Sequence, residues 1–463
     1  MSPADQFQAI VIGSGQGGNP LCMALANAGL RTALVERKHV GGTCVNEGCT
    51  PTKTMVASGR AAYIARRGSD YGVRTGPISV DMERVRQRKR DIVDMFRTRS
   101  EGRLKQFPDL ELIPGEASFT GPKTVRVRLK DGGERALTAE TIVIDAGTRP
   151  SVPALDGLKD APFLDSTSIM ELGVVPEHLL VLGGGYVGLE FGQMFRRFGS
   201  RVSIVQSGAQ LLRGGDPDVA DEVAAIMRQD GIEVLLGAKG TRVATTATGI
   251  QLSVRIGDET RELPGSHLLV AIGRTPNTDS LNLAAAGIAT DGRGFIKVNG
   301  KLETSAAGIF AMGDINGGPA FTHISYDDFR ILRSNLIEKG NVTTEGRLVP
   351  YTVYIDPQLG HVGLSETQAR AQGRNIRVAR MPMTGVARAL EVDESRGFMK
   401  AIVDAETGQI LGATVLGLEG GEIMSMLELA MLGKLPYTVL RDAVFAHPTL
   451  AECLNNLFTH FDS

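Results

Sequence analysis

The stretch Gln8-Ala-Ile-Val-Ile-Gly-Ser-Gly-Gln-Gly-Gly18 begins as a short apolar run and ends in closely spaced glycines. Such an apolar run is typical of a buried parallel strand. A helical pattern follows the glycines Gly13, Gly15 and Gly18, and a second apolar run, 32–36, ends in Glu36. Strand, glycine turn, helix and acid in this register predict a βαβ unit that binds a dinucleotide. The pyrophosphate is expected at the helix start and a ribose hydroxyl at Glu36.

The same pattern occurs a second time along the chain. Residues 179–183 form an apolar run, a glycine turn follows, and residues 201–205 form the returning strand. The glycines of this second turn are Gly183, Gly185 and Gly188. Two such units in one chain predict two nucleotide cofactors, FAD and a nicotinamide nucleotide, with electrons passing between them.

The second unit lacks the acid that ends the first. Gln206 and Ser207 stand where an acid would bind the ribose of NADH and where an arginine would favour NADPH. Losing the acid removes repulsion against a 2'-phosphate, which Ser207 or Arg213 could contact. We therefore expect a slight preference for NADPH and keep NADH as the alternative.

Length and composition limit the class of protein. A chain of 463 residues is expected to form two to four domains. The formal net charge of −2 gives no general case for a nucleic acid or an anionic membrane as partner. We find no apolar run near the roughly 18 residues that span a bilayer and no room for a signal peptide before the first strand. These observations predict a soluble, cytoplasmic protein.

The segment 81–107 is rich in arginine and is expected to be helical. Interspersed acids and an apolar stripe of Ile92, Val93 and Phe96 favour a solvated helix over a nucleic-acid surface. Alternating residues on either side of the turn at 131–133 predict paired strands. Near the C-terminus, strands at 351–355, 398–403 and 410–415 are expected to precede a helix through residues 424–431.

Two of the four cysteines, Cys44 and Cys49, lie five positions apart directly after the first nucleotide-binding pattern. This is redox spacing, and no second pair nearby suggests a metal site; we expect no metal. On a regular helix these Cα atoms would be roughly 8 to 9 Å apart, too far for a disulfide. A bridge would require the chain to leave helical geometry, and Gly48 is the residue that allows it. The next segment reads as a helix, so a Cys49 thiolate would lie near a helix start, where its pKa is lowered.

The block 41–53, Gly-Gly-Thr-Cys-Val-Asn-Glu-Gly-Cys-Thr-Pro-Thr-Lys, resembles the redox-active segment of the flavoprotein disulfide reductases. That family includes dihydrolipoamide dehydrogenase, glutathione reductase and mercuric reductase, and the resemblance covers nearly the entire chain. It implies an α/β fold with two Rossmann-like domains of the glutathione reductase type and a C-terminal α+β dimerisation domain. The implied domains are FAD-binding in 1–150 and 273–346, NAD(P)-binding in 151–272 and dimerisation in 347–463, so that the protein forms a homodimer.

The resemblance also assigns residues. His447 matches the family's His-Pro-Thr-x-x-Glu motif, and Pro448 predicts that His447 lies just outside a helix start with Glu452 about one turn in. A histidine steered by a carboxylate suits proton transfer in thiol–disulfide exchange. The implied catalytic residues are Cys44, Cys49, His447, Glu452, Lys53 and Glu190. The implied cofactor-binding residues are Gly13, Gly15, Gly18, Glu36, Arg37, Thr43, Lys53, Gly115, Ala117, Gly147, Asp314, Thr322, Gly183, Gly185, Tyr186, Gly188, Gln206, Ser207, Gly273 and Arg274.

The reaction implied by the resemblance passes electrons from NAD(P)H through FAD to a disulfide between Cys44 and Cys49. Cys49 would then be the thiolate nearer the flavin, and Cys44 the thiol that attacks a disulfide substrate. His447 of the partner subunit would manage the proton. Lys53 and Glu190 would form an ion pair near the flavin. Asp314 would hold the ribityl chain, and Tyr186 either covers the nicotinamide pocket or is a packing aromatic.

The substrate stays open. Thr50 replaces the usual aliphatic residue, and Phe445 stands where dihydrolipoamide dehydrogenases usually have a second histidine. The vicinal C-terminal cysteines of mercuric reductases are missing, and Cys453 is expected to be a buried helix residue. We therefore expect a disulfide-type substrate other than lipoamide. The alternatives are reduction of a metal or quinone from the reduced flavin or dithiol, and a non-catalytic redox sensor.

Overall fold

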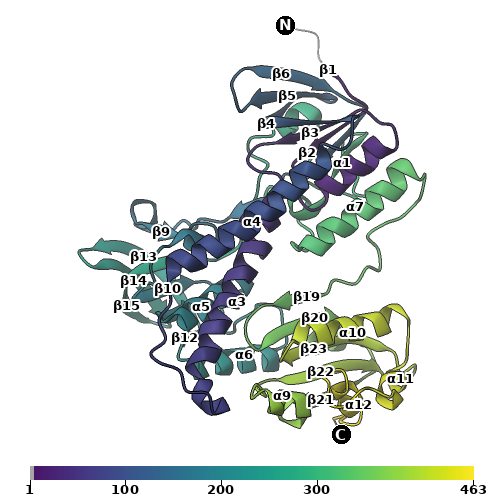
Figure 1. Ribbon diagram of the computed structural model, residues 1–463. Helices are drawn as coiled ribbons and strands as arrows, with labels where there is room; N and C mark the ends of the chain where they lie inside the picture. The colour runs from purple at the N-terminus through teal and green to yellow at the C-terminus, as the bar shows by residue number, and fades with distance from the viewer. Residues whose placement is uncertain (1–4, 463) are drawn as a thin grey trace. The chain divides into compact units, whose positions relative to one another are not determined.

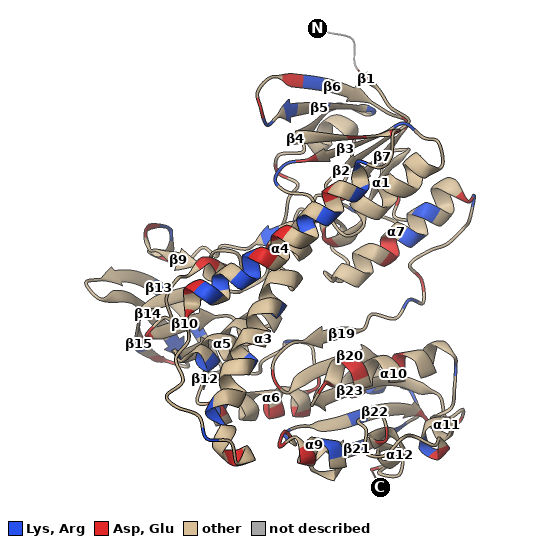
Figure 2. Cartoon of the chain, in the orientation of Figure 1, with Lys and Arg blue, Asp and Glu red and all other residues tan. Residues whose placement is uncertain are grey.

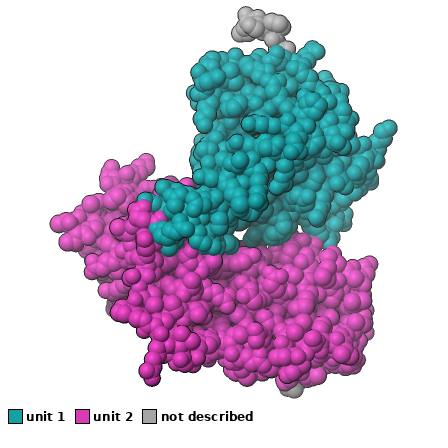
Figure 3. All heavy atoms as spheres, in the orientation of Figure 1, with its two compact units in different colours: residues 1–54, 84–151, 273–347 teal, residues 55–83, 152–272, 348–463 magenta. Residues whose placement is uncertain are grey.

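The computed structural model describes residues 5–462, and its contacts divide the chain into two compact units. Unit 1 comprises residues 1–54, 84–151 and 273–347, and unit 2 comprises residues 55–83, 152–272 and 348–463 (Figure 3). The NAD(P)-type segment and the C-terminal segment fall in one unit, together with residues 55–83. The division into FAD-binding, NAD(P)-binding and dimerisation domains therefore stays a prediction.

An eight-stranded sheet forms the centre of unit 1, in the order β1-β6-β5-β4-β3-β2-β7-β18 (Figure 1). Its strands are β1 (Asp5–Gln6), β2 (Ala9–Ile12), β3 (Thr32–Glu36), β4 (Leu110–Gly121), β5 (Thr124–Leu129), β6 (Glu134–Thr138), β7 (Thr141–Ile144) and β18 (Ile309–Ala311). The five strands from β4 to β18 in this order run parallel, whereas β4, β5 and β6 form an antiparallel meander. The predicted first βαβ unit and the predicted strand pair around the turn at 131–133 are both present.

The apolar run of β2 is buried on both faces of this sheet. Ile10 and Ile12 pack into one apolar cluster, and Ala9 and Val11 pack into the cluster on the opposite face. Successive side chains of a strand point to opposite faces, so a strand covered on both sides must be apolar throughout. Helices α1 (Gly18–Asn27) and α7 (Thr322–Ile337) lie side by side (Figure 1) and supply residues to the second cluster.

Helix α4 (Met82–Leu104) is the predicted arginine-rich helix, and basic and acidic residues alternate along it (Figure 2). Its apolar stripe is only partly covered, because Val93 is buried while Phe96 is 43% exposed. Arg97 donates to the Asn46 side chain at 2.8 Å and Arg88 donates to the Thr54 carbonyl at 2.7 Å. Some of its arginines thus hold the segment that carries the cysteine pair.

Unit 2 contains the second predicted βαβ unit in a five-stranded parallel sheet of order β12-β11-β10-β16-β9 (Figure 1). Its strands are β9 (Phe163–Leu164), β10 (His178–Leu182), β11 (Arg201–Val205), β12 (Glu233–Leu235) and β16 (His267–Val270). Helices α5 (Tyr186–Phe198) and α6 (Pro217–Gln229) belong to the same region. A three-stranded antiparallel sheet of β13 (Ala238–Thr246), β14 (Gly249–Ile256) and β15 (Glu259–Gly265) completes it.

The C-terminal part of unit 2 is an antiparallel sheet of order β19-β20-β23-β22-β21. Its strands are β19 (Tyr351–Val353), β20 (Gln358–Gly363), β21 (Ile376–Pro382), β22 (Phe398–Asp404) and β23 (Ile410–Gly417). Helix α10 (Gly420–Leu432) packs on β20 and β23 (Figure 1). Shorter helices are α8 (Glu366–Ala371), α9 (Ala387–Glu391), α11 (Tyr437–Asp442) and α12 (Cys453–Leu457). The predicted strands and helix of this region are all present.

Helix α3 (Cys49–Arg66) begins in unit 1 and continues into unit 2. Across residues 5–462, none of the helices combines the length and the apolar character that crossing a bilayer requires.

Candidate active site

The first glycine turn lies between β2 and α1, and two of its glycines are fixed by close backbone contacts. Gly13 has a φ of 105°, and a Cβ there would lie 2.2 Å from the Asp145 carbonyl oxygen. A Cβ on Gly18 would lie 2.2 Å from the Gly13 carbonyl oxygen. The Glu36 carboxylate accepts hydrogen bonds from the Ser14 N–H at 3.0 Å and from its hydroxyl at 2.6 Å. The turn therefore brings backbone N–H groups to the start of α1, as a pyrophosphate site requires.

Asp145 is a residue of this site that the sequence analysis missed. Its carboxylate accepts a hydrogen bond from the Gly18 N–H at 2.8 Å, and a Cβ on Gly15 would lie 2.6 Å from the same oxygen. Burial raises the pKa of Asp145 well above its usual range, and the nearby carboxylates Asp314 and Asp328 raise it further. A buried acid therefore lies directly behind the first glycine turn.

The second glycine turn repeats this geometry in unit 2. Gly183 has a φ of 117°, and a Cβ on it would lie 2.3 Å from the Ala271 carbonyl oxygen. A Cβ on Gly188 would lie 2.0 Å from the Gly183 carbonyl oxygen, whereas Gly185 has open space around it. Ala271 thus occupies the position that Asp145 holds in the first turn. The two turns have the same backbone arrangement, but the residue behind the first is the acid Asp145 and the residue behind the second is the uncharged Ala271.

Gln206 anchors the second turn as Glu36 anchors the first. Its side-chain oxygen accepts a hydrogen bond from the Gly184 N–H at 3.0 Å, and its amide nitrogen donates to the Gln210 carbonyl at 3.2 Å. Ser207 and Arg213 are exposed. A neutral amide therefore stands where an acid would bind a ribose.

Two predicted cofactor residues contact Thr148, which sequence reasoning did not single out. The Thr148 hydroxyl donates to Asp314 at 2.9 Å and accepts from Arg274 at 2.6 Å. Gly147 precedes Thr148 with a φ of 62°, and Gly273 precedes Arg274 with a φ of 136°. Strands β8 (Thr148–Pro150) and β17 (Arg274–Pro276) pair antiparallel and hold these residues together.

Other predicted cofactor residues lie near the end of β3. Glu36 is paired with Pro114 in the sheet, which places Gly115 and Ala117 on the neighbouring strand β4. A Cβ on Gly115 would lie 2.6 Å from a Val127 methyl group, so packing of β4 against β5 also requires this glycine. Arg37 forms an exposed ion pair with Glu116 at 3.3 Å.

The cysteine pair lies across a break between two helices, as predicted. Helix α2 (Gly42–Asn46) contains Cys44, and α3 begins at Cys49. Gly48 lies in this break, as expected, and it does not have a positive φ. It is required for close approach: a Cβ there would lie 2.9 Å from the Thr43 carbonyl oxygen.

The two cysteines are present as thiols that face one another and Thr322. Thr322 is the first residue of α7, and its hydroxyl lies 3.2 Å from the Cys49 sulfur. The pKa of Cys44 is raised, first by its hydrogen bond with the Cys49 side chain and then by burial, while Thr322 and Lys53 lower it. The contact with Cys49 and burial both favour the thiol form of Cys44, so its use as a nucleophile calls for a base.

Lys53 and Glu190 are placed on different units, so their predicted ion pair stays a prediction. Lys53 lies four residues after Cys49 on α3 and is half-buried. Glu190 is 6% exposed on α5, and it accepts a hydrogen bond from the Tyr354 N–H at 2.9 Å. Tyr186, the first residue of α5, stacks on Tyr351 with ring centroids 5.2 Å apart.

His447 and Glu452 are paired, although the local structure differs from the prediction. His447 Nδ1 lies 2.8 Å from a Glu452 carboxylate oxygen. Pro448 does not begin a helix: α12 begins at Cys453, and Glu452 is its N-cap residue. The prediction of a helix start at Pro448 was therefore wrong, because the chain after His447 forms bends before α12 begins. The histidine side chain is 68% exposed.

The remaining cysteines and candidate metal ligands were also located. Cys453 is buried in α12, as predicted, and burial raises its pKa to about 12. Cys22 is buried in α1. Within residues 5–462 no three His, Cys, Asp or Glu side chains are grouped so that they could hold a metal ion.

Two dinucleotide-binding turns and a cysteine pair at a helix start define a nucleotide-dependent redox protein. Residues 7–328 match the family model described as pyridine nucleotide-disulphide oxidoreductase, and residues 349–458 match the dimerisation domain of that family. The chain belongs to the pyridine nucleotide-disulfide oxidoreductases, which are FAD-dependent enzymes that use NAD(P)H. It is therefore an oxidoreductase with FAD and a nicotinamide nucleotide as cofactors.

Similar proteins fall in several branches of this family. The probable pyridine nucleotide-disulfide oxidoreductase RclA of Escherichia coli is 38% identical over 98% of this chain and 99% of that protein. A mercuric reductase of Lysinibacillus sphaericus is 32% identical over 99% of this chain and 83% of its own length. A dihydrolipoyl dehydrogenase of Geobacillus stearothermophilus is 31% identical over 97% of this chain and 95% of its own length.

A solved structure supports the fold. The Cu(II) complex of the HOCl-induced flavoprotein disulfide reductase RclA from Escherichia coli superposes with a TM-score of 0.90. The two chains are 38% identical, with 98% of this chain and 99% of that one covered. The glutathione reductase-type α/β fold expected from the sequence is confirmed.

Proposed function

We propose that Cys44 and Cys49 form a redox couple that passes electrons from NAD(P)H, by way of FAD, to a disulfide-type substrate other than lipoamide. The observation that carries this proposal is the contact between the two thiols and Thr322 at the start of α7. Reactive cysteines are partly exposed, whereas buried structural cysteines are inert. This pair instead lies partly exposed at two helix starts.

The residues present suit FAD at the first glycine turn. Gly13, Gly15 and Gly18 form a tight turn with no space for a Cβ at any of them, and Glu36 is placed for a ribose hydroxyl. Asp314, with Thr148 and Arg274, would hold the ribityl chain. The bound flavin supplies the electron pair that opens the Cys44–Cys49 disulfide.

The remaining chemistry is thiol–disulfide exchange by the chain's own residues. His447 of the partner subunit would take the proton of Cys44, and the resulting thiolate would attack one sulfur of the substrate to form a mixed disulfide. The leaving thiolate would then take this proton back from the histidine. Cys49 then attacks the Cys44 sulfur, which re-forms the internal disulfide and releases the second thiol. Glu452 orients the imidazole through Nδ1 and stabilises its cationic form.

The homodimer follows from the dimerisation domain and from exposed apolar residues within it. Leu429 is 67% exposed, Leu432 is 61% exposed and Val444 is fully exposed. Large apolar side chains left in water are a mark of protein interfaces. In such a dimer each active site would use the histidine of the other chain.

The nicotinamide nucleotide would bind at the second glycine turn, with Tyr186 covering its pocket and Lys53 paired with Glu190 near the flavin. Neutral Gln206 favours NADPH slightly over NADH. The infrequent cysteines and the redox role of two of them support a cytoplasmic location.

Anaerobic titration tests the redox couple. FAD-loaded protein is reduced with NADPH, and thiols are counted before and after addition of glutathione disulfide, lipoamide or another low-molecular-weight disulfide. We expect two new thiols per chain on reduction and their loss on turnover with one of these disulfides. Cys44→Ser should abolish disulfide turnover while leaving NADPH-dependent reduction of a quinone dye unchanged. Equal turnover of every disulfide by wild type and Cys44→Ser would refute the proposal.

Metal reduction is the second candidate, because the similar RclA structure is a Cu(II) complex. Reduction of Cu(II) to Cu(I) by the dithiol would consume two metal ions and leave the disulfide. A Cu(I) chelator that absorbs visible light would follow this reaction under argon. Loss of Cu(II) reduction in Cys44→Ser would favour this candidate, whereas a purely redox-sensing protein would show no steady turnover with any acceptor.

A further inference from the structure

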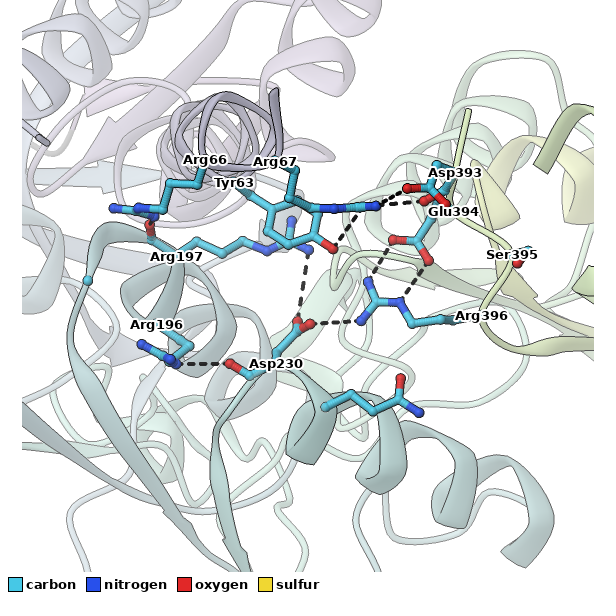
Figure 4. Close-up of a pocket in the computed structure, with 12 residues that line it drawn as sticks. Tyr63, Arg66, Arg67, Arg196, Arg197, Asp230, Asp393, Glu394, Ser395 and Arg396 are labelled. Atoms are coloured by element: carbon cyan, nitrogen blue, oxygen red, sulfur yellow. Dashed lines mark hydrogen bonds and ion pairs between the residues drawn. The ribbon is translucent and has the colours of Figure 1, made fainter. Parts of the chain in front are cut away.

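A cavity of about 590 Å³ lies inside unit 2 (Figure 4). It is formed where α3 and α5 end, together with the end of α6 and the segment 393–396. Five arginines line it: Arg66, Arg67, Arg196, Arg197 and Arg396. Because α5 begins at Tyr186 and the cavity is at its other end, about 18 Å of helix separate the cavity from the second glycine turn.

Three acids line the same cavity, and each is already bound by an arginine. Arg396 binds Asp230 at 2.7 Å and Glu394 at 2.6 Å. Asp393 is bound by Arg67. The acids therefore neutralise these arginines and offer no unsatisfied negative charge to a cation.

Arg66 and Arg196 are bound differently, because their partners are backbone carbonyls. Arg66 donates to the carbonyls of Arg197 and Phe198 in the last turn of α5. Arg196 donates to the Asp230 carbonyl at 2.9 Å. In the part of the chain that the structure describes, neither guanidinium forms an ion pair with a carboxylate. The cavity therefore keeps an excess of positive charge.

Arg197 also lines the cavity, and contacts within the protein hold its side chain in place. Its side chain is only 5% exposed, and its guanidinium stacks 4.1 Å above the Tyr63 ring and binds the buried Asp356. Its Nε is buried and has no hydrogen-bond partner among residues 5–462. A buried donor without a partner is rare and costly.

We propose that this cavity binds a compact anion with at least two negative charges, through phosphate or carboxylate oxygens. Guanidinium groups hold such oxygens by paired hydrogen bonds, and several of them converge here from separate elements. The volume falls within the range of small-molecule sites, roughly 300 to 1,000 Å³. The bound anion would join the ends of α3 and α5 to the segment 393–396.

The test measures binding of pyrophosphate and of citrate to the FAD-loaded full-length protein by calorimetry. Sodium chloride keeps the ionic strength constant, because charge screening alone would change arginine pairing. We expect saturable binding of at least one probe. Pyrophosphate alone would assign phosphate chemistry, and citrate alone would assign carboxylate chemistry. Absence of saturable binding by both probes would overturn the proposal.

Two variants separate this cavity from the glycine turns. Arg66→Gln and Arg196→Gln leave no acid unpaired, and each should weaken binding at least tenfold. Arg242→Gln, an exposed arginine beside Asp156, is the matched control and should bind as wild type does. Equal binding by all three variants would place the anion elsewhere and overturn the proposal.

Hydrogen exchange on wild-type protein covers the case in which a variant does not fold. The bound probe should slow exchange of the amides in 63–67 and 196–200. Unchanged exchange in both segments at saturating probe would count against the cavity.

Discussion

Gln206 accepts a hydrogen bond from the Gly184 N–H at 3.0 Å, and Glu36 accepts one from the Ser14 N–H at the same distance. Glu36 is the last residue of β3 and Gln206 directly follows β11, and each donor is the second residue of its glycine turn. The two nucleotide sites are therefore held by the same contact, once by a carboxylate and once by a neutral amide. Charge, and not backbone geometry, distinguishes them.

This relationship predicts that Gln206→Glu shifts the enzyme toward NADH. The new carboxylate would keep the contact with Gly184, bind the ribose 2'-hydroxyl and repel a 2'-phosphate. We expect the ratio of kcat/KM for NADH over NADPH to rise by on the order of tenfold. Steady-state rates with a quinone dye measure it. Gln210→Glu, whose side chain contacts the Gly215 carbonyl instead, is the control; an unchanged ratio in Gln206→Glu would contradict the assignment.

Cys49→Ala should lower the pKa of Cys44. The hydrogen bond with Cys49 is the main cause that raises this pKa, so its loss leaves burial as the principal remaining cause. The rate of alkylation by iodoacetamide, followed by mass spectrometry from pH 6 to 10, should rise at a lower pH than in the reduced wild type. Cys22 and Cys453 are buried with raised pKa values and serve as internal controls that stay unmodified.

Glu452→Gln should slow disulfide turnover without affecting the flavin. The amide can still contact His447 Nδ1, but it no longer stabilises a protonated imidazole. We expect kcat for the disulfide substrate to fall by roughly tenfold to a hundredfold, within the range that proton transfer contributes. NADPH-dependent reduction of a quinone dye should keep its rate. A parallel loss of both activities would show that Glu452 is structural.

Asp145→Asn should stabilise the protein at neutral and alkaline pH. The pKa of Asp145 is raised in the folded state, chiefly by burial, so the folded state binds a proton that the unfolded state releases. Binding of this proton stabilises the folded state in full below the pKa of Asp145 in the unfolded chain, about 4. The stabilisation is lost as pH rises through the pKa of Asp145 in the folded state. Asn keeps an acceptor for the Gly18 N–H. Thermal unfolding from pH 5 to 9 should show a flatter dependence in Asp145→Asn, and identical profiles would argue against a titrating Asp145.

Lys400→Met should destabilise unit 2. Lys400 is 2% exposed and contacts Asp216 at 2.7 Å and Asp218 at 2.8 Å. Removing one partner of a buried ion pair costs about 3 to 5 kcal/mol. The exposed neighbour Arg380, 3.6 Å from Asp218, provides the control Arg380→Met, for which we expect a loss under about 1 kcal/mol.

The contacts between Lys400 and Asp216 also predict that stability falls at acid pH. Burial raises the pKa of Asp216, but hydrogen bonds from Lys400 and Thr367 outweigh it and hold that pKa below its usual range. The ionised Asp216 side chain stabilises the folded state above its pKa in the unfolded chain, about 4. This stabilisation is lost as pH falls through the pKa of Asp216 in the folded state. Urea unfolding should therefore show the Lys400→Met penalty at pH 7 and a smaller one at pH 3. A penalty that does not change with pH would show that packing, not charge, causes it.

The sequence by itself determined the two βαβ units, the break between Cys44 and Cys49, and the pairing of His447 with Glu452. These features depend on residues close together in the chain, where apolar period, glycine spacing and offset act directly on local conformation. Local reasoning failed at Pro448, which starts no helix, because the chain after His447 forms bends before α12 begins.

Only the tertiary structure brought Asp145 behind the first glycine turn, Thr322 against the two thiols, and five arginines around one cavity. Each of these groups joins segments separated by more than a hundred residues, from β7 to α1 or from α3 to the segment 393–396. No periodic pattern marks such residues, because their burial and charge depend on neighbours that only folding supplies. The order in which the strands pair decides which strand and helix ends lie together. It therefore also decides which side chains can act together at those ends.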